Sequence, residues 1–338
     1  MIKNRLVLID AFALIHRAYH ALPPLTSKDG KQVNAVYGFT SALLSAIKEL
    51  EPEYLAVGFD LPGPTKRHLA FKDYKAHRPA TPEELKSQIP YVKEILKALN
   101  IPIVAAEGYE GEDVIATIVA KCKMQNAKCK IMECIIVTGD MDVLQLVDEK
   151  TKVYSMARGV NQAVIYDEEK VKERYGLKPS QLVDYKALRG DPSDNIPGVK
   201  GIGEKTASSL IKQFGTLEKL YQAISNYQFF RQRRIRLGRT ISNQIANSKS
   251  QISKKIPKNP NISEKILRVL LENKEQAFLS QKLAKIAKYA PLEFDLATAR
   301  LHDFDEQKVI ELFEIFGFKS LISRLPKAEK AENQPKLL

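Results

Sequence analysis

Nine carboxylates in this sequence are placed so that several of them could meet. They lie on five segments of the chain: Asp10, Asp60, Glu110, Glu112, Asp113, Asp140, Asp142, Asp191 and Asp194. Two like charges ~4 Å apart repel each other by about 4 kcal/mol at an effective dielectric of 20, so such a cluster needs positive charge. Carboxylates without His or Cys favour Mg²⁺ or Mn²⁺ over zinc. Two such ions can clamp the attacking and leaving oxygens of a phosphodiester, which makes phosphodiester hydrolysis the first hypothesis.

The segments that carry these carboxylates alternate between predicted strands and helices. Apolar runs predict buried strands at 5–11, 54–60, 101–106 and 134–140, and helical spacing predicts helices over 34–50, 83–99 and 112–125. This alternation predicts an α/β fold with a mainly parallel sheet. Asp10, Asp60 and Asp140 end three of the strands, where open α/β sheets bind ligands. Each could instead be a helix cap, but capping explains three such ends poorly.

The second half of the chain has a different pattern. Residues 152–166 predict a hairpin that turns near Arg158 and Gly159, and short helices closed by glycine follow. We therefore expect an α/β domain over 1–168, a mainly helical subdomain over 169–323, and a disordered tail over 324–338.

Bulk properties favour an anionic partner. The 338 residues carry a formal net charge of +13, and residues 219–263 contain no Asp or Glu. This acid-free window predicts either an extra DNA-binding limb or a disordered basic loop. No apolar run is long enough to span a membrane. The three cysteines form no CxxC motif, so we expect reduced thiols and a cytoplasmic protein.

Three motifs give the chain a resemblance to a known family. "GYEGEDVIAT" (108–117), "TGDMDVLQLV" (138–147) and "GDPSDNIPGVKGIGEKTA" (190–207) resemble signatures of the 5′ nuclease family. More narrowly, the chain resembles the N-terminal 5′→3′ exonuclease domain of bacterial DNA polymerase I, a relative of the flap endonucleases, over roughly residues 4–323. The resemblance implies a PIN-like fold with a helical arch about 64–96, and a two-ion site of Mg²⁺ or Mn²⁺ held by the nine carboxylates.

The sequence departs from the family pattern at two positions. Glu112 stands where the family has Asp, and Met141 stands where it has Lys. The longer side chain of Glu112 extends its carboxylate by about 1.5 Å, which affects metal geometry. These departures keep a second hypothesis open, a catalytically impaired module that binds DNA junctions.

Basic and aromatic residues over 65–78 could hold the DNA strand. On one continuous helix, Arg67, Phe71, Tyr74, Lys75 and Arg78 would form a single stripe. An amphipathic helix packed on the core has the same pattern. The resemblance implies that this stripe is the arch that admits a 5′ end, with Tyr74, Lys75 and Arg78 as catalytic residues and Arg17 as a further DNA contact.

The glycine-rich stretch 198–207 predicts a phosphate contact, because glycines and a helix N-terminus expose backbone N–H groups. An ordinary turn between two helices is the alternative. The resemblance implies a helix–hairpin–helix element with bound K⁺, whose DNA-binding residues are Gly198, Lys200, Gly201, Gly203, Lys205 and Thr206.

The resemblance also implies the partners. We expect a monomer that acts on DNA with a 5′ flap, a nick or an RNA primer, with no membrane. A polymerase is either encoded separately or removed from this chain. A PIN-type ribonuclease is a weaker third hypothesis, and the stretch 198–207 argues against it.

Overall fold

The computed structural model describes residues 4–124, 131, 133–156, 163–241, 262–301 and 304–326, with the backbone alone over 230–241. These residues form two compact units. The first contains the described residues up to Val171 and again from Ile286, and the second contains Lys172–Lys285. Each unit is described by itself.

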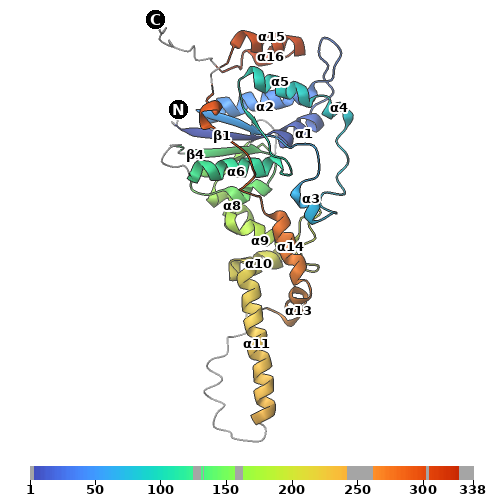
Figure 1. Cartoon of the computed structure of the whole chain (residues 1–338), viewed down its shortest axis with the longest axis vertical. Helices are drawn as coiled ribbons and strands as arrows, with labels where there is room; N and C mark the ends of the chain where they lie inside the picture. The colour runs from blue at the N-terminus through green and yellow to red at the C-terminus, as the bar shows by residue number, and fades with distance from the viewer. Residues whose placement is uncertain are drawn as a thin grey trace. The chain divides into compact units, whose positions relative to one another are not determined.

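A six-stranded sheet is the centre of the first unit (Figure 1), with the strand order β3-β2-β1-β4-β5-β6. Only the β5–β6 pair is antiparallel. The mainly parallel α/β fold predicted from the sequence is therefore confirmed. The strands are β1 (Arg5–Asp10), β2 (Tyr54–Gly58), β3 (Ile103–Val104), β4 (Glu133–Thr138), β5 (Thr151–Ser155) and β6 (Val164–Tyr166). The strands of the predicted hairpin are β5 and β6, while its turn lies outside the described residues.

The order of the strands reverses at β1. The chain moves from β1 to β2 and β3 on one side, and continues from β4 to β5 on the other. At such a reversal the loops after neighbouring strands separate and leave a crevice beyond the carboxyl ends. Asp10 is the last residue of β1, while Asp60 and Asp140 each follow a strand end by two residues.

The first unit contains eight described α-helices besides α8. They are α1 (Ala11–Ala21), α2 (Asn34–Leu50), α3 (Lys66–Ala70), α4 (Glu83–Lys86), α5 (Ile89–Ala98), α6 (Gly111–Met124), α15 (Glu306–Phe316) and α16 (Lys319–Ile322), with 3₁₀ turns η1 (Asp142–Leu146) and η5 (Leu296–Ala299). In α8 (Glu168–Tyr175) the chain passes into the second unit.

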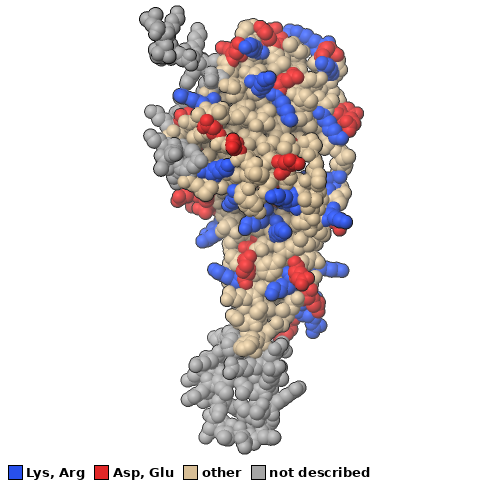
Figure 2. All heavy atoms as spheres, viewed as in Figure 1, with Lys and Arg blue, Asp and Glu red and all other residues tan. Residues whose placement is uncertain are grey.

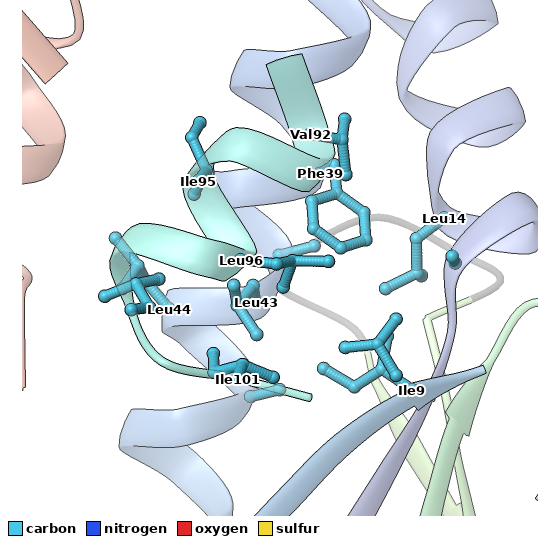
Figure 3. Close-up of a cluster of buried hydrophobic side chains, with 14 of the residues drawn as sticks. Ile9, Leu14, Phe39, Leu43, Leu44, Val92, Ile95, Leu96 and Ile101 are labelled. Carbon is cyan, nitrogen blue, oxygen red and sulfur yellow. The ribbon is translucent and has the colours of Figure 1, made fainter. Parts of the chain in front are cut away.

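Helices α1, α2 and α5 bury their apolar faces against one face of the sheet (Figure 3). Ile9 of β1 packs there with Phe39 and Leu43 of α2 and with Leu96 of α5, all almost fully buried. Burying one such side chain contributes about 1.5–3 kcal/mol, so this cluster fixes the position at which β1 ends. Val309 and Phe313 of α15 belong to the same cluster. The sequence predicts that helix within the second domain (169–323), whereas its core contacts lie in the first unit.

The second unit is helical, in agreement with the sequence. It contains η2 (Pro179–Gln181), α9 (Leu182–Arg189), α10 (Glu204–Phe214), α11 (Leu217–Ile241), α13 (Glu264–Glu272) and α14 (Lys274–Ala284). Helix α11 covers the first half of the acid-free window, and residues 242–261 lie outside the described range, as do 327–338. No helix in the described part of the chain is long and apolar enough to cross a membrane.

Candidate active site

A cavity of about 340 Å³ lies beyond the carboxyl ends of β1, β2 and β4. Five of the predicted metal ligands line it: Asp10, Asp60, Glu110, Glu112 and Asp140. They come from four segments that are far apart in the sequence, and the strand reversal brings them together. Lys75 and Arg78 also line the cavity, together with His16 and His68, which sequence analysis did not single out.

Asp10 is both a helix cap and a cavity residue. Its side chain is buried and accepts hydrogen bonds from the Ala13 N–H (3.2 Å), as the N-cap of α1, and from the Thr138 hydroxyl (2.8 Å). Burial raises the pKa of Asp10 to about 7, with repulsion from Asp60 and Asp140 as a smaller cause, although the two hydrogen bonds act to lower it. The capping interpretation is thus correct for this residue, which also lines the cavity, while its metal ligation stays a prediction.

Thr138, which the sequence did not flag, joins two of the carboxylate loops. Its hydroxyl donates to Asp10 Oδ2 and accepts from the Asp140 N–H at 3.0 Å. Asp140 Oδ1 in turn accepts from the Asp142 N–H at 2.8 Å, which directs the chain into η1. A buried hydroxyl that uses both its donor and its acceptor fixes the geometry of both loops.

Asp60 lies against the start of α6. Its Oδ1 accepts from the Gly111 N–H at 2.7 Å, the first residue of that helix. Burial raises the pKa of Asp60, and the nearby charge of Glu110 raises it further. The helix N-terminus contributes only about 0.3–1 kcal/mol of favourable interaction with such a charge. The helix N-terminus therefore offsets only part of the cost of this buried charge, and Lys75 offsets a further part.

Protein cations supply the positive charge at Glu110. Lys75 Nζ donates to Glu110 Oε2 at 2.6 Å, and Arg67 Nη1 lies 3.3 Å from the same oxygen. Burial raises the pKa of Glu110, but Lys75 and Arg67 outweigh it and leave the pKa below its usual value. Arg67 Nη2 also lies 3.0 Å from Glu112 Oε1. The pKa of Glu112 nevertheless stays well above its usual value because this carboxyl group is buried.

Asp113 has a different environment from its neighbours. Its two oxygens accept a bidentate pair from Arg67 (2.7 and 2.9 Å), and they also accept the N–H groups of Glu110 (3.1 Å) and Ala287 (2.7 Å). Four donors on a buried carboxylate make a structural anchor. Asp113 and Asp142 do not line the cavity, so their predicted metal ligation is the least supported within the first unit.

The single helical stripe expected over 67–78 is not present. Helix α3 ends at Ala70, Phe71 has an extended backbone, and Lys75 has a left-handed φ of 55°. The sequence "FKDYKAHRPATP" (71–82) has no apolar face long enough to support a continuous helix through its Pro79. Tight turns replace it, and they direct Lys75 and Arg78 into the cavity.

The predicted stripe residues therefore have distinct positions. Arg67, predicted to contact DNA, is only 8% exposed and pairs with carboxylates. Tyr74, predicted as catalytic, is 1% exposed and its hydroxyl donates to Glu110 Oε2 at 3.3 Å. Phe71 and Arg17 are half-buried, and Arg78 is exposed. Burial of Arg67 is the main physical difference from the sequence-based expectation.

Asp191 and Asp194 belong to the second unit, and both are buried there. Lys186 Nζ donates to Asp191 Oδ2 at 2.6 Å, while the N–H and hydroxyl of Ser193 donate to Oδ1. Burial raises the pKa of Asp191, but the Lys186 ammonium outweighs it and lowers the pKa overall. Their metal ligation stays a prediction of the sequence.

Gly198 is a packing residue. It has φ of +63°, its N–H donates to the Ser280 hydroxyl at 3.0 Å, and a Cβ there would lie 2.2 Å from the Gly190 nitrogen. Its N–H is thus engaged inside the second unit and not offered to a phosphate. Gly201 and Gly203 have open space around them, with exposed Lys200 and Lys205 nearby in the chain.

The cavity fits divalent metal ions by the chemistry of its donors. Among the described residues, no three His, Cys, Asp or Glu side chains are spaced to enclose an ion as they stand. Arg67 and Lys75 bind the oxygens of Glu110 and Glu112 instead. Burial raises the pKa values of Asp10, Asp60 and Glu112, with repulsion from neighbouring carboxylates as a smaller cause. A divalent ion would offset both effects, and hard carboxylate oxygens suit Mg²⁺ or Mn²⁺.

Charge on the molecular surface is mixed. On the face shown in Figure 2, Lys and Arg side chains lie among Asp and Glu over the described part of the chain. Cys122 and Cys134 are buried and form no disulfide, in line with the expected reduced thiols, whereas Cys129 lies outside the described residues.

Comparison with known proteins places this geometry in context. Family models of the 5′-3′ exonuclease match both halves, the N-terminal resolvase-like domain over residues 5–176 and the C-terminal SAM fold over 177–307. A 5′-3′ exonuclease of Aquifex aeolicus is 40% identical over 223 residues, which cover 66% of this chain and 74% of the relative.

Longer relatives and a solved structure agree. DNA polymerase I of Bacillus caldotenax is 37% identical over 98% of this chain, and the chain spans about a third (34%) of its length. The flap endonuclease of bacteriophage T5, solved with DNA and metal ions, has the same fold (TM-score 0.59, 20% identity, 93% of this chain and 99% of that one). With its resolvase-like sheet, its carboxylate cavity and its helical second unit, the chain belongs to the 5′-3′ exonuclease family.

Proposed function

We propose that the chain hydrolyses DNA phosphodiesters as a divalent-metal-dependent 5′→3′ exonuclease and 5′-flap endonuclease. The observation that carries this proposal is the cavity in which five carboxylates from four segments meet Lys75 and Arg78. Family membership supports the exonuclease activity. The fold shared with the T5 flap endonuclease, whose printed description includes DNA and metal ions, supports the flap substrate.

Asp10, Asp60, Glu112 and Asp140, together with Glu110, would hold the metal ions. When bound, a pair of divalent ions activates water as a nucleophile and stabilises the leaving oxygen. The protein contributes by fixing the ligands beforehand. Thr138 holds the loops of Asp10 and Asp140, and the first N–H of α6 holds Asp60.

Lys75 and Arg78 are the residues proposed to contact the scissile phosphate. Both line the cavity on turns that follow α3, and guanidinium and ammonium groups neutralise phosphate oxygens. Lys75 pairs with Glu110 in the free protein, so it would exchange one anionic partner for another when DNA enters. Tyr74 holds Glu110 in place. Arg67 is proposed as a positioning residue, because it joins α3 to three carboxylates at the start of α6.

The second unit is proposed to grip the duplex. Gly203 is the N-cap of α10, and open space surrounds it, so the first N–H groups of this helix are proposed to bind a phosphate. K⁺ is proposed to bind at the Gly198–Gly203 element. Lys200, Gly201, Lys205 and Thr206 would contact the backbone beside it. The proposed setting is a monomer in the bacterial cytoplasm that acts at flaps, nicks or RNA primers, with polymerase activity supplied by a separate or adjoining domain.

Cleavage of a labelled 5′-flap duplex tests this proposal. Purified protein with Mg²⁺ or Mn²⁺ should release short 5′ products, and EDTA should abolish them. An intact flap at saturating protein with either metal would reject the proposed activity.

One observation favours a second candidate, an impaired junction-binding module. Glu112, which replaces the Asp of the family, pairs with Arg67 at 3.0 Å. The variant Glu112→Asp separates the two candidates. A gain of about 100-fold in cleavage would identify the natural sequence as impaired, whereas an unchanged or lower rate would identify Glu112 as an adapted ligand.

A further inference from the structure

An exposed aromatic side chain contacts the residue that precedes Glu110 of the carboxylate cavity, and neither the family signatures nor the proposed chemistry uses it. Tyr289 is 74% exposed, although aromatic rings usually bury most of their area. Its ring stands perpendicular to the buried ring of Tyr109, with 6.4 Å between the centroids. Tyr109 directly precedes Glu110 of the cavity.

The backbone around Tyr289 is held rigidly on α6. Three side chains spaced four residues apart on this helix bind the segment that contains it. Asp113 accepts the Ala287 N–H (2.7 Å), Thr117 accepts the Ala290 N–H (3.0 Å), and Lys121 donates to the Leu292 carbonyl. Tyr289 lies between the first two of these contacts. Three polar side chains of α6 therefore hold the backbone on both sides of Tyr289, while the Tyr289 ring is exposed to solvent.

A lysine ammonium group lies beside the ring of Tyr109. Lys66 Nζ lies 4.3 Å from the centroid of Tyr109 and donates to its hydroxyl, so the ammonium is held beside the tyrosine pair. Lys66 directly follows Thr65, which lines the cavity. Leu69, 76% exposed, lies one turn along the same face of α3. A rigid exposed ring next to a fixed cation matches the chemistry of a nucleotide, which has a flat base and an adjoining phosphate.

We propose that Tyr289 stacks on an unpaired base of the DNA substrate at the mouth of the cavity, while Lys66 contacts the adjoining phosphate. This inference rests on the proposed function and adds to it a residue that positions the strand. A preformed ring loses little conformational entropy on stacking, so the contact adds affinity without depending on base identity.

Binding of a fluorescein-labelled 5′-flap duplex, followed by anisotropy in EDTA, tests the inference without hydrolysis. Tyr289→Ala should weaken binding by about fivefold or more, the lower end of the range for loss of one stacked base. Tyr289→Phe keeps the ring and should stay within about twofold of the natural protein. Met124→Ala, which removes another highly exposed apolar side chain (78%) of the same unit, serves as the matched control and should have no effect.

An abasic scan identifies the stacked base. One abasic position in the substrate should weaken binding by the natural protein but not by Tyr289→Ala, because both changes remove the same contact. The inference is overturned if Tyr289→Ala binds normally, if Tyr289→Phe is as weak as Tyr289→Ala, or if every abasic effect is simply additive with Tyr289→Ala. Flap cleavage by the natural protein in Mg²⁺ is scored separately, so loss of the stacking contact and loss of the proposed function give different results.

Discussion

Replacement of Asp10 by Asn should stabilise the metal-free protein. Asp10 has a pKa of about 7 in the folded chain, against an ordinary value of 3.8, mainly because it is buried. Between about pH 4 and pH 7 the native state therefore binds a proton that the unfolded state does not. A group with a raised carboxyl pKa lowers the free energy of unfolding as pH rises through this window. A rise of the pKa from 3.8 to about 7 corresponds to a loss of up to about 4 kcal/mol above pH 7.

Asn keeps the contacts and removes the charge. Its amide oxygen can still cap α1 at the Ala13 N–H, since Asn is as good an N-cap as Asp. Its NH₂ group can donate to the Thr138 hydroxyl, which is able to rotate and accept. The expected gain for Asp10→Asn is thus up to about 4 kcal/mol at about pH 8, falling towards zero at about pH 4.

Urea unfolding followed by circular dichroism measures this gain, because the chain has no Trp to serve as a fluorescence probe. Both proteins are unfolded in EDTA at a series of pH values, and then with Mg²⁺. Metal should stabilise the natural protein more than the variant. The reasoning is refuted if Asp10→Asn is the less stable protein at about pH 8 without metal, or if the difference between the two proteins does not change with pH.

Three further substitutions test the site and the second unit. Arg67→Met leaves the buried carboxylate of Asp113 without its cation and should lower the free energy of unfolding by about 3–5 kcal/mol, measured by urea unfolding. Thr138→Val removes the donor to Asp10 and should lower the free energy of unfolding by about 1–2 kcal/mol. It should reduce the rate of flap cleavage by a larger fraction than it reduces the free energy of unfolding. Gly198→Ala places a Cβ 2.2 Å from a backbone nitrogen and should cost at least about 3 kcal/mol, measured by thermal unfolding.

Each substitution has a matched control. Lys86→Ala removes an exposed ion pair and should lower the free energy of unfolding by less than about 1 kcal/mol. If Arg67→Met lowered it by no more than Lys86→Ala does, the buried ion pairs of Arg67 would not stabilise the fold as argued. Thr138→Ser keeps the hydroxyl and should retain most of the cleavage rate. Gly201 also has a positive φ, but open space surrounds it. If Gly201→Ala lowered the free energy of unfolding by more than about 1 kcal/mol, backbone strain and not steric contact would explain the effect of Gly198→Ala.

The fold was largely predictable because apolar runs and helical spacing determine where elements form. Helix α2 has the predicted limits, and β1 and β4 differ from their predicted limits by one or two residues. The same patterns placed Asp10, Asp60 and Asp140 at one edge of the sheet. Sequence periodicity reports which face of an element is buried, and this was enough to gather carboxylates that lie up to 130 residues apart.

The internal ion pairs were not predictable in the same way. The sequence of 65–78 has the spacing of a helical stripe, but tertiary contacts decide that Arg67 is buried and that Lys75 lies on a turn. Positive charge near Glu110 was expected to come from metal ions, and protein cations occupy that position in the free chain. Thr138 gave no signal either, because a threonine at a strand end is common and its two hydrogen bonds depend on neighbours in three dimensions.

Single-turnover cleavage by two carboxylate variants tests the central claim most directly. Asp60→Asn and Asp140→Asn remove one charge each from the cavity, whereas Asp148→Asn removes a charge from a residue that pairs with Lys123 and does not line it. With saturating protein, a 5′-flap duplex and a Mg²⁺ titration, both cavity variants should lose at least about 100-fold in rate, and Asp148→Asn should stay within about twofold. Cleavage at the natural rate by either cavity variant would contradict the assignment of this cavity as the active site.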